Sequence, residues 1–124
     1  MATGTSQCIV GIVDDDRAVR EALCNLLASL GLEVAAFGSA EEFIASAEST
    51  KLNCLILDVT LPGMSGPELQ RRLVEDRNIV PIILITANPD QDVRKRALEH
   101  GAAAFFYKPI RSDVFLDALR ATLG

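Results

Sequence analysis

Short apolar runs alternate with amphipathic segments from one end of the chain to the other. Five of the runs have the length and character of β-strands: Ile9–Val13, Glu33–Phe37, Cys54–Leu57, Ile79–Ile85 and Ala102–Tyr107. The third and fourth runs contain no polar residue, which is typical of strands that are covered on both faces of a sheet. The pattern therefore predicts buried strands of the kind found in parallel sheets.

Between these runs, apolar residues recur at the three- and four-residue spacing of one helix face. The first such segment is Val19–Leu30, and Gly31 after it favours the left-handed conformation that ends helices. Asp16, just before this segment, is expected to cap the helix or to lie in solvent. Serines followed three residues later by glutamate have the spacing of a capping box, and they predict helix starts at Ser39 and Ser65.

Two further helices are predicted toward the C-terminal end. Pro89 is expected at the first position of one of them, because the N–H that proline lacks is not needed there, and Gly101 ends it. Ser112 is expected to cap the last helix. Strands that alternate with helices are joined by right-handed crossovers, which makes their sheet parallel. The predicted fold class is therefore α/β, a doubly wound parallel sheet of five strands with five helices.

Length and composition are those of one globular domain. The chain has 124 residues, 49% of them hydrophobic and 23% charged, which is too apolar for a disordered segment and too short for two cores. The 12 Lys and Arg residues are outnumbered by 17 Asp and Glu residues, and the net charge of −5 is opposite to the sign that phosphate-backbone binding requires. We therefore expect no direct binding of nucleic acid by this domain.

The three cysteines, at positions 8, 24 and 54, lie within apolar runs and form no metal-binding or disulfide pattern. We expect them to be core thiols, which suits a reducing cytoplasm. Residues 1–7 are interpreted as a short disordered lead-in and residues 8–124 as the domain. No apolar run approaches the roughly 18 residues of a membrane span, so no membrane association is expected.

Residues with charged or hydroxyl side chains follow four of the apolar runs directly. Asp14 and Asp15 follow the first run, Asp58 the third, Thr86 the fourth and Lys108 the fifth. In a doubly wound sheet the carboxyl ends of the strands lie along one edge, where ligands bind. Three carboxylates brought together there would repel one another and raise one another's pKa, so a cation is expected among them. Oxygen-rich sites of this kind suit Mg²⁺.

The same residues suit phosphoryl transfer. A carboxylate can attack phosphorus and form an acyl phosphate when a metal ion and a positive side chain neutralise the charge on the transferring oxygens. Asp58 is the predicted nucleophile, because it ends a fully apolar strand and lies between the acidic pair and Lys108. Thr86 is expected to donate a hydrogen bond to one phosphoryl oxygen, and Lys108 to pair with another.

Together these motifs resemble the receiver domains of bacterial two-component response regulators over essentially the whole chain. The matching segments are Val13-Asp14-Asp15, the phosphoacceptor region Leu57–Gly66, Ile85-Thr86-Ala87 and Lys108-Pro109. The resemblance implies a flavodoxin-like sheet with the strand order 2-1-3-4-5. It also implies a cytoplasmic signalling domain rather than an enzyme with a separate substrate, although such domains catalyse their own phosphorylation and dephosphorylation.

The resemblance, carried over by position, implies a role for each residue of the cluster. Asp58 is the residue phosphorylated by a sensor histidine kinase. Asp15, Asp58 and the backbone carbonyl of Thr60 form the Mg²⁺ shell, and Asp14 binds the metal through water. Thr86 is the hydroxyl that switches position after phosphorylation.

Three further features follow from the same resemblance. Phe105, three residues before Lys108, matches the switch aromatic, although alternation along a strand leaves open that either of two adjacent phenylalanines is simply a core residue. The Lys108–Pro109 peptide bond is cis in the family, which would direct the ammonium into the site. Thr60 and Asn88 border the path of an attacking water and are expected to tune the lifetime of the phosphorylated state.

Other classes of protein fit the sequence less well. A flavodoxin-like carrier would place a flavin phosphate where this chain has three aspartates, and a phosphatase of the haloacid dehalogenase type needs a second aspartate at the position of Thr60. A receiver-like docking scaffold that works without phosphorylation and the receiver segment of a hybrid histidine kinase remain alternatives. Residues Ser39–Phe43 resemble receivers of the nitrogen-fixation regulator (FixJ-like) group, which implies control of transcription.

The resemblance also implies that phosphorylation changes the surface formed by the fourth helix, the fifth strand and the fifth helix. Thr86 would move toward the phosphoryl group, and Phe105 would turn inward. This surface has mixed charge, with the residues Arg94, Arg96, Glu99, Asp113, Asp117 and Arg120. Because mixed charge can pair with a symmetric copy, we predict homodimerisation that is promoted by phosphorylation.

Overall fold

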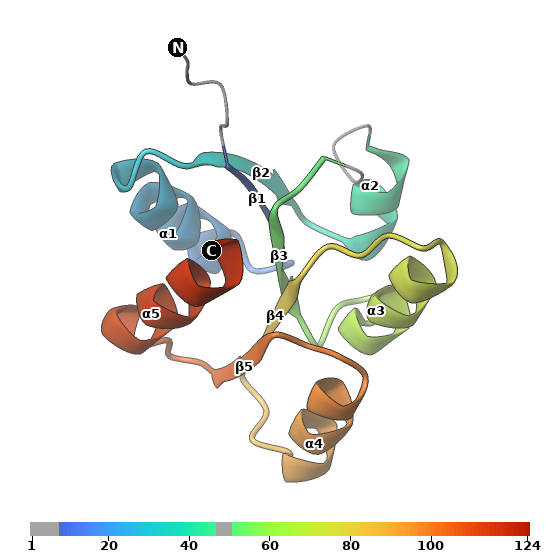
Figure 1. The fold of residues 1–124 in the computed structure, drawn as a ribbon. Helices are drawn as coiled ribbons and strands as arrows, with labels where there is room; N and C mark the ends of the chain where they lie inside the picture. Colours follow the sequence, from blue (N-terminus) through green and yellow to red (C-terminus); the bar gives the residue numbers. More distant parts are fainter. Residues whose placement is uncertain (1–7, 47–50) are drawn as a thin grey trace.

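The computed structural model describes residues 8–46 and 51–124, which form five strands and five helices (Figure 1). The strands are β1 (Ile9–Val13), β2 (Glu33–Phe37), β3 (Cys54–Asp58), β4 (Ile82–Thr86) and β5 (Ala104–Tyr107). The helices are α1 (Arg17–Ser29), α2 (Ala40–Ala45), α3 (Gly66–Glu75), α4 (Gln91–Glu99) and α5 (Ser112–Leu123). The lead-in predicted for residues 1–7 lies outside the described residues.

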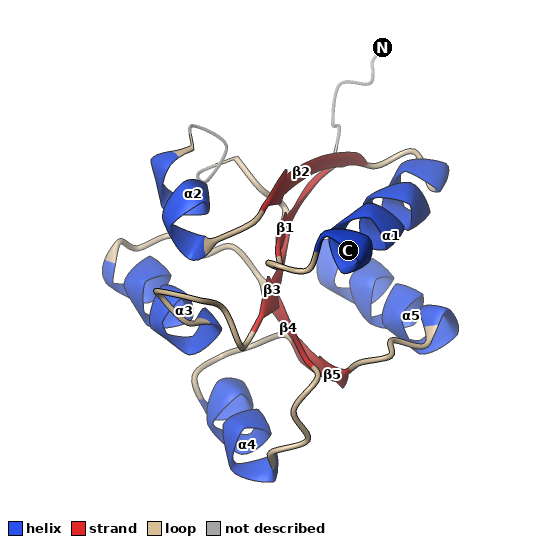
Figure 2. Cartoon of the chain, turned by 180° about the vertical axis from the view of Figure 1, so that it is seen from behind, coloured by secondary structure: helices blue, strands red, loops and turns tan. Residues whose placement is uncertain are grey.

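The five strands form one parallel sheet in the order β2-β1-β3-β4-β5. Helices α1 and α5 cover one face of this sheet, and α2, α3 and α4 cover the other (Figures 1 and 2). The predicted α/β class, the doubly wound sheet and the strand order 2-1-3-4-5 are confirmed. The order reverses between β1 and β3, and in such folds ligands bind outside the carboxyl ends of the strands at that point.

Successive strand residues face opposite sides of the sheet, which builds two cores. Phe43 and Leu57 are fully buried in the core under α2, α3 and α4, whereas Ile56 and Phe115 are fully buried in the core under α1 and α5. Every residue of β3 and β4 is buried, as their uninterrupted apolar runs predict. None of the helices in residues 8–46 and 51–124 is long and apolar enough to cross a membrane.

Two strands begin later than the sequence predicts. β4 begins at Ile82 rather than Ile79, because Pro81 has no N–H to donate to the sheet and the Ile79 side chain is 93% exposed. β5 begins at Ala104 rather than Ala102, because the Ala102 N–H still donates to a carbonyl of α4. The predicted starts of both strands are therefore wrong by two or three residues.

Three of the predicted helix starts agree with the structure. Asp16 caps α1 by accepting hydrogen bonds from two backbone N–H groups of the first turn, which confirms its capping role. Ser65 makes both hydrogen bonds of a capping box with Glu68 at the start of α3. Ser39 accepts a hydrogen bond from the Glu42 N–H at the start of α2. Such caps satisfy N–H groups that would otherwise lack partners.

The starts of the last two helices differ from the prediction. Asp90 caps α4 through its side chain, so Pro89 precedes the helix and does not occupy its first position. The Asp90 carboxylate can accept hydrogen bonds from the free N–H groups of the first turn, so the helix starts after Asp90. Arg111 stands at the cap position of α5, and Ser112 is the first helical residue, so the predicted capping role of Ser112 is wrong.

The three cysteines are free thiols. Cys54 is buried, and burial raises the pKa of its thiol to about 12, which keeps it protonated and unreactive. Cys8 and Cys24 are partly exposed. The predicted core position is therefore confirmed for Cys54, Cys24 packs against the core from its edge, and the prediction is wrong for Cys8, which belongs to neither core.

Candidate functional site

The charged residues predicted from the strand ends converge at one edge of the sheet. One oxygen from each of Asp14, Asp15 and Asp58 lies within 4.8 Å of the other two. The Lys108 Nζ lies 2.8 Å from Asp14 Oδ2 and 3.1 Å from Asp58 Oδ2. Residues that follow β1, end β3 and follow β5 therefore form one cluster, as a common carboxyl edge of parallel strands requires. We call these four residues the acidic cluster.

Backbone N–H groups fix the two buried carboxylates of the acidic cluster. In each case the N–H two residues further along the chain donates to Oδ1, at 2.9 Å for Asp14 and 3.0 Å for Asp58. The other oxygen of each carboxylate lies next to Lys108. Asp14 is fully buried and Asp58 nearly so, whereas Asp15 is exposed. The cluster is thus rigidly held at its base and open to solvent at Asp15.

Lys108 is held as a cation. Burial by itself lowers the pKa of the ammonium, but the hydrogen bonds and charges of Asp14 and Asp58 outweigh burial and raise the pKa of Lys108 above its ordinary value. The peptide bond between Lys108 and Pro109 is cis. The ammonium therefore stays charged at neutral pH between the two carboxylates.

The favourable interactions of the Asp58 carboxylate do not fully offset the cost of burying its charge. Desolvation raises its pKa and the charge of Asp14 adds to the increase, whereas the Thr60 N–H and the Lys108 ammonium act in the opposite direction; the net pKa of Asp58 is raised. When all three carboxylates are ionised, the Lys108 ammonium leaves two negative charges in the cluster. A divalent cation would balance that charge, and carboxylate oxygens are the donors that Mg²⁺ prefers.

The loop between β3 and α3 turns back sharply beside the acidic cluster. The Gly66 N–H donates to the Val59 carbonyl at 3.0 Å, and a Cβ atom at position 66 would collide with the Asp58 backbone carbonyl. Glycine is therefore required for this close approach. Thr60 lies on this loop two residues beyond Asp58, and its carbonyl remains a predicted metal ligand.

Two residues that hold the site in place were missed in the sequence. Arg20 Nη1 donates to the Asp14 backbone carbonyl at 2.7 Å, and Glu41 Oε2 accepts from the Met64 N–H at 2.8 Å. The first contact joins α1 to the end of β1, and the second joins α2 to the loop after β3. Arg20 and Glu41 look like ordinary surface residues of their helices in the sequence. No local sequence pattern therefore indicates that they make these contacts.

Thr86 and Lys108 are joined through the backbone at the ends of β4 and β5. The Lys108 N–H donates to the Thr86 carbonyl at 2.7 Å. The Thr86 side chain is buried, and its Oγ1 accepts from the Asn88 N–H at 3.1 Å. The predicted switch hydroxyl of Thr86 therefore lies at the same edge of the sheet as the acidic cluster. Asn88, two residues further along the chain, is held beside Thr86 by this hydrogen bond.

The aromatic residues of β5 alternate between the two faces of the sheet. Phe105 is buried in the core under α2, α3 and α4, and the Phe105 and Tyr107 rings pack in a T-shaped arrangement with their centroids 5.4 Å apart. Phe106 faces the other way and contacts Phe115 at 5.7 Å. Tyr107, not Phe105, is the cross-strand partner of Thr86. Its hydroxyl is buried and has no hydrogen-bond partner among the described residues, a feature that the sequence did not indicate.

Comparison with known proteins decides the family. A family model described as the response regulator receiver domain matches residues 10–120, which include the whole acidic cluster. The chain belongs to the response regulator receiver family. Among curated relatives of this receiver domain, the response regulator protein TodT of Pseudomonas putida and nodulation protein W of Bradyrhizobium diazoefficiens are each 44% identical, over 115 and 117 residues. The transcriptional regulatory protein FixJ of Azorhizobium caulinodans is 37% identical over 115 residues.

These alignments cover 93%, 94% and 93% of the receiver domain but only 51%, 52% and 54% of the relatives, in the same order. The chain thus spans about half the length of the curated relatives it matches. Among solved structures, the crystal structure of FixJ-N is 34% identical with a TM-score of 0.86, and it covers 96% of this chain and 95% of that one. The response regulator StyR is 42% identical with a TM-score of 0.87, at 95% and 60% coverage. The predicted resemblance to receivers with FixJ-like relatives is confirmed.

Proposed function

We propose that Asp58 accepts a phosphoryl group from a phosphohistidine of a sensor histidine kinase, in a reaction that requires Mg²⁺. The observation that carries this proposal is the position of the Lys108 ammonium, 2.8 Å from Asp14 and 3.1 Å from Asp58. An ammonium in this place can pair with a phosphoryl oxygen as charge develops on the transferring group. An Asp58 oxygen forms the new bond to phosphorus. The bond from phosphorus to the kinase imidazole breaks, and the imidazole nitrogen keeps the electron pair and takes up a proton.

The carboxylates of Asp15 and Asp58 and the Thr60 carbonyl would hold the Mg²⁺, with Asp14 acting through water. When bound, the ion supplies neutralisation of charge on the phosphoryl oxygens. The raised pKa of Asp58 supports this fit, because a nearby cation favours the ionised form of a carboxyl. Ionised Asp58 is the form that attacks phosphorus, so metal binding and nucleophilicity favour each other.

Phosphorylation of Asp58 is then transmitted to the surface formed by α4, β5 and α5. Thr86 donates a hydrogen bond to a phosphoryl oxygen, and Phe105, whose ring is already buried in the core rather than turned outward as the sequence predicts, shifts toward the space that the hydroxyl leaves. Thr60 and Asn88, each two residues beyond a site residue, set how readily water reaches the acyl phosphate. Because several relatives are named as transcriptional regulators, the output we propose is control of transcription in the cytoplasm.

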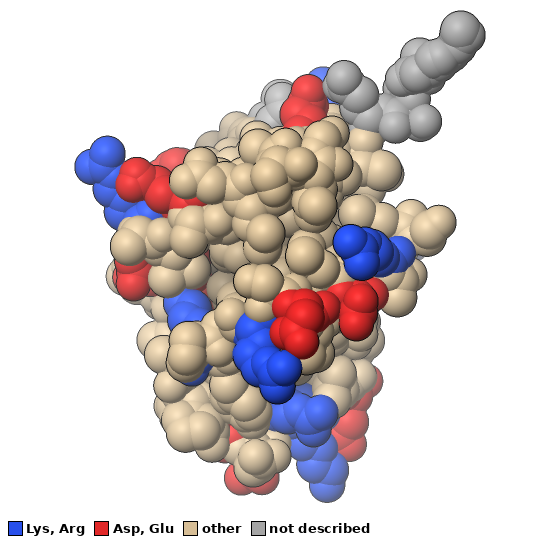
Figure 3. Space-filling view, turned by 90° about the vertical axis from the view of Figure 1, so that its left-hand side faces the viewer, with Lys and Arg blue, Asp and Glu red and all other residues tan. Residues whose placement is uncertain are grey.

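In this proposal the receiver domain does not itself bind DNA. The net charge of −5 disfavours contact with a phosphate backbone. On the face of the molecule formed by α1 and α5, acidic and basic side chains are interspersed rather than gathered into one basic patch (Figure 3). The partners proposed for this domain are a sensor histidine kinase and, after phosphorylation, a second copy of the chain.

Intact mass measurement after incubation with a small phosphodonor tests the proposal. With Mg²⁺, the wild type should gain one phosphate, and Asp58→Asn should gain none because the amide is not a nucleophile. Asp76→Asn is the control, since Asp76 is an exposed carboxylate that pairs with Arg72 far from the acidic cluster, and it should label like the wild type. Absence of any labile phosphate on the wild type would instead favour a docking scaffold that works without phosphorylation.

A further inference from the structure

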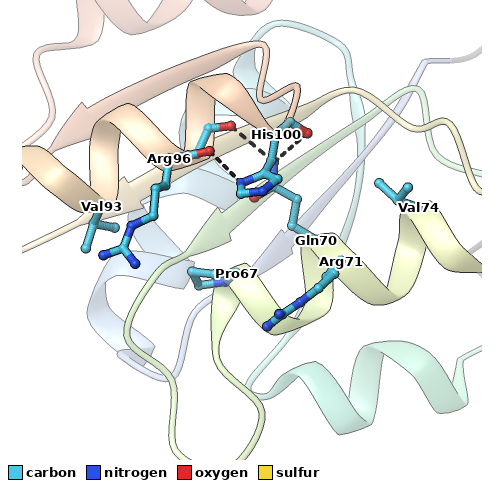
Figure 4. A pocket seen from close by; sticks show the side chains of 8 residues that line it. Pro67, Gln70, Arg71, Val74, Val93, Arg96 and His100 are labelled. Carbon is cyan, nitrogen blue, oxygen red and sulfur yellow. Dashed lines mark hydrogen bonds between the residues drawn. The ribbon is translucent and has the colours of Figure 1, made fainter.

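A cleft lies between α3 and α4, apart from the acidic cluster (Figure 4). Its volume is about 360 Å³, which falls in the range of roughly 300–1,000 Å³ that is typical of sites for small molecules. Apolar side chains from both helices line it, together with Arg71 from α3 and Arg96 from α4. The lining includes no residue of the acidic cluster, so the cleft is a separate feature.

Two guanidinium groups give the cleft its charge. Figure 4 shows Arg71 and Arg96 on either side of Pro67, each reaching from its own helix. Within residues 8–46 and 51–124, neither guanidinium forms an ion pair with a carboxylate, and Arg96 Nε donates only to the backbone carbonyl of Asp92 at 3.4 Å. In a chain of net charge −5, this local pair of uncompensated cations favours an anion.

The floor of the cleft is already formed. Gln70 is 5% exposed, and its amide Nε2 lies 3.4 Å from both the Ala97 and the His100 carbonyl oxygens, which ties α3 to the end of α4. Figure 4 shows the Gln70 side chain reaching from α3 toward the end of α4 at His100. A preformed floor lowers the entropy lost when a ligand binds.

Exposed apolar surface continues from one end of the cleft. A second hollow of about 210 Å³ shares Gln70, Val74 and His100 with the cleft and extends to Ile79. Val74 is 64% exposed and Ile79 is 93% exposed, so both side chains leave apolar surface uncovered along this hollow. A ligand with an apolar body that covered these side chains would remove their surface from water, which is favourable.

We propose that this cleft binds a small amphiphilic organic anion, a carboxylate carried on an apolar chain or ring. The carboxylate would accept charge-assisted hydrogen bonds from Arg71 and Arg96, while the apolar body would cover Val93 and extend along Val74. Inorganic phosphate would leave the apolar walls uncovered, and a neutral lipid would leave the guanidinium groups unpaired. The proposal does not depend on the phosphoryl chemistry of Asp58.

A titration of ¹⁵N-labelled protein with octanoate, octanol and acetate, followed by amide chemical shifts, tests the proposal. Octanoate should shift amides of α3 and α4 in a saturable way, and octanol and acetate should each bind at least about ten-fold more weakly, because each lacks one half of the recognition. The double variant Arg71→Ala/Arg96→Ala should lose at least about ten-fold in octanoate affinity. Arg94→Ala is the matched control, since Arg94 is exposed on α4 and does not line the cleft.

Three results would overturn the proposal. They are equal affinity for octanoate and octanol, unchanged octanoate affinity in the double variant, and shifts that scatter over the surface without saturating. The arginines are exposed, so their replacement leaves the core intact, and the spread of the amide spectrum verifies folding. Asp58→Asn should bind octanoate like the wild type, which separates a failure of this site from a failure of the phosphoryl chemistry.

Discussion

Lys108 lies between two buried carboxylates, Asp14 and Asp58, and is their shared counterion. Removing one partner from such a group leaves a desolvated charge behind, which is strongly destabilising. A Lys108 variant would therefore change folding and chemistry together. Asp15 is exposed and makes no ion pair with Lys108, so its replacement tests metal binding with little disturbance of the fold.

We predict that Asp15→Ala lowers Mg²⁺ affinity by more than about ten-fold, because even groups that only support metal ligands are worth that much. Stability without metal should rise, since one of three crowded negative charges is removed. Calorimetric titration measures the affinity. Asp16→Asn is the control: it removes a neighbouring charge but keeps an amide oxygen that can cap α1. Undiminished Mg²⁺ binding by Asp15→Ala would contradict its role as a ligand.

Tyr107 carries a buried hydroxyl without a hydrogen-bond partner among the described residues. Burying such a group costs about 1–3 kcal/mol, and phenylalanine has the same ring without the hydroxyl. We predict that Tyr107→Phe raises the free energy of unfolding by about 1 kcal/mol in urea denaturation, while the contact with the Phe105 ring is kept. A less stable variant would show that the hydroxyl is satisfied in solution.

At the scale of elements, Glu41 links α2 to the loop between β3 and α3. Its carboxylate accepts from the Met64 N–H, and this hydrogen bond lowers the pKa of Glu41 below its ordinary value of 4.5. A lowered pKa in the folded state means that the link stabilises the fold above pH 4.5 and is lost as the pH falls through the lowered value. The loop passes so close to α2 that a Cβ atom at Gly63 would lie 2.6 Å from Glu41 Oε2.

This packing predicts a difference between two glycines. Gly63 and Gly31 both have positive φ, at 75° and 80°, but a Cβ atom at Gly31 would meet nothing within 4 Å. Alanine at either position should cost about 1–2 kcal/mol in backbone strain. Gly63→Ala should cost more than Gly31→Ala, because the new methyl group displaces the Glu41 carboxylate. Urea denaturation measures both.

The double variant Gly63→Ala/Glu41→Ala is the decisive comparison for this contact. Its loss of stability should not exceed the sum of the Gly31→Ala and Glu41→Ala losses, since no carboxylate remains to be displaced. Equal losses for the two single glycine variants would show that Glu41 does not hold the loop.

The alternation of strands and helices could be predicted because apolar spacing depends on local geometry alone. Element boundaries were less accurate where two local signals competed. Pro81 extends an apolar run but cannot donate to the sheet, and Pro89 fits a first helical turn but is followed by the stronger cap Asp90. At these positions hydrogen bonding, rather than hydrophobicity, sets the boundary.

The acidic cluster could be predicted because parallel topology brings strand ends together whatever their separation in the sequence. Arg20 and Glu41 could not, because their contacts depend on how helices pack against loops. The orphan hydroxyl of Tyr107 is a property of the packed core and has no counterpart in the sequence. The strand order came from the resemblance to known receivers, since apolar spacing alone gave only the fold class.

At the scale of the whole molecule, the surface of α4, β5 and α5 is where we expect phosphorylation to act. On α5, Asp117 pairs with Arg120 at 3.8 Å, and Asp113 pairs with Arg111 at 3.0 Å. These pairs are exposed and therefore contribute little to stability. They can exchange partners with a second copy of the same surface at small cost.

We predict that phosphorylation shifts the chain from monomer to dimer. Sedimentation velocity with phosphodonor and Mg²⁺ should show the dimer for the wild type, whereas Thr86→Ala should take up phosphate but stay monomeric because the switch hydroxyl is missing. A ligand shifts such an equilibrium only through different contacts in the two states, and Thr86 provides that difference. A phosphorylated wild type that stays monomeric at high micromolar concentration would contradict the prediction.

We expect Asp58 alone to carry the phosphoryl group. Borohydride reduces an acyl phosphate to an alcohol, so a phosphorylated aspartate is converted to homoserine and can be located by peptide mass spectrometry. After incubation with phosphodonor and Mg²⁺, we predict homoserine at position 58 and at no other aspartate, and none when Mg²⁺ is left out. Homoserine at position 14, 15 or 16 in place of position 58, or no homoserine at all, would contradict the assignment of Asp58 as the phosphoacceptor.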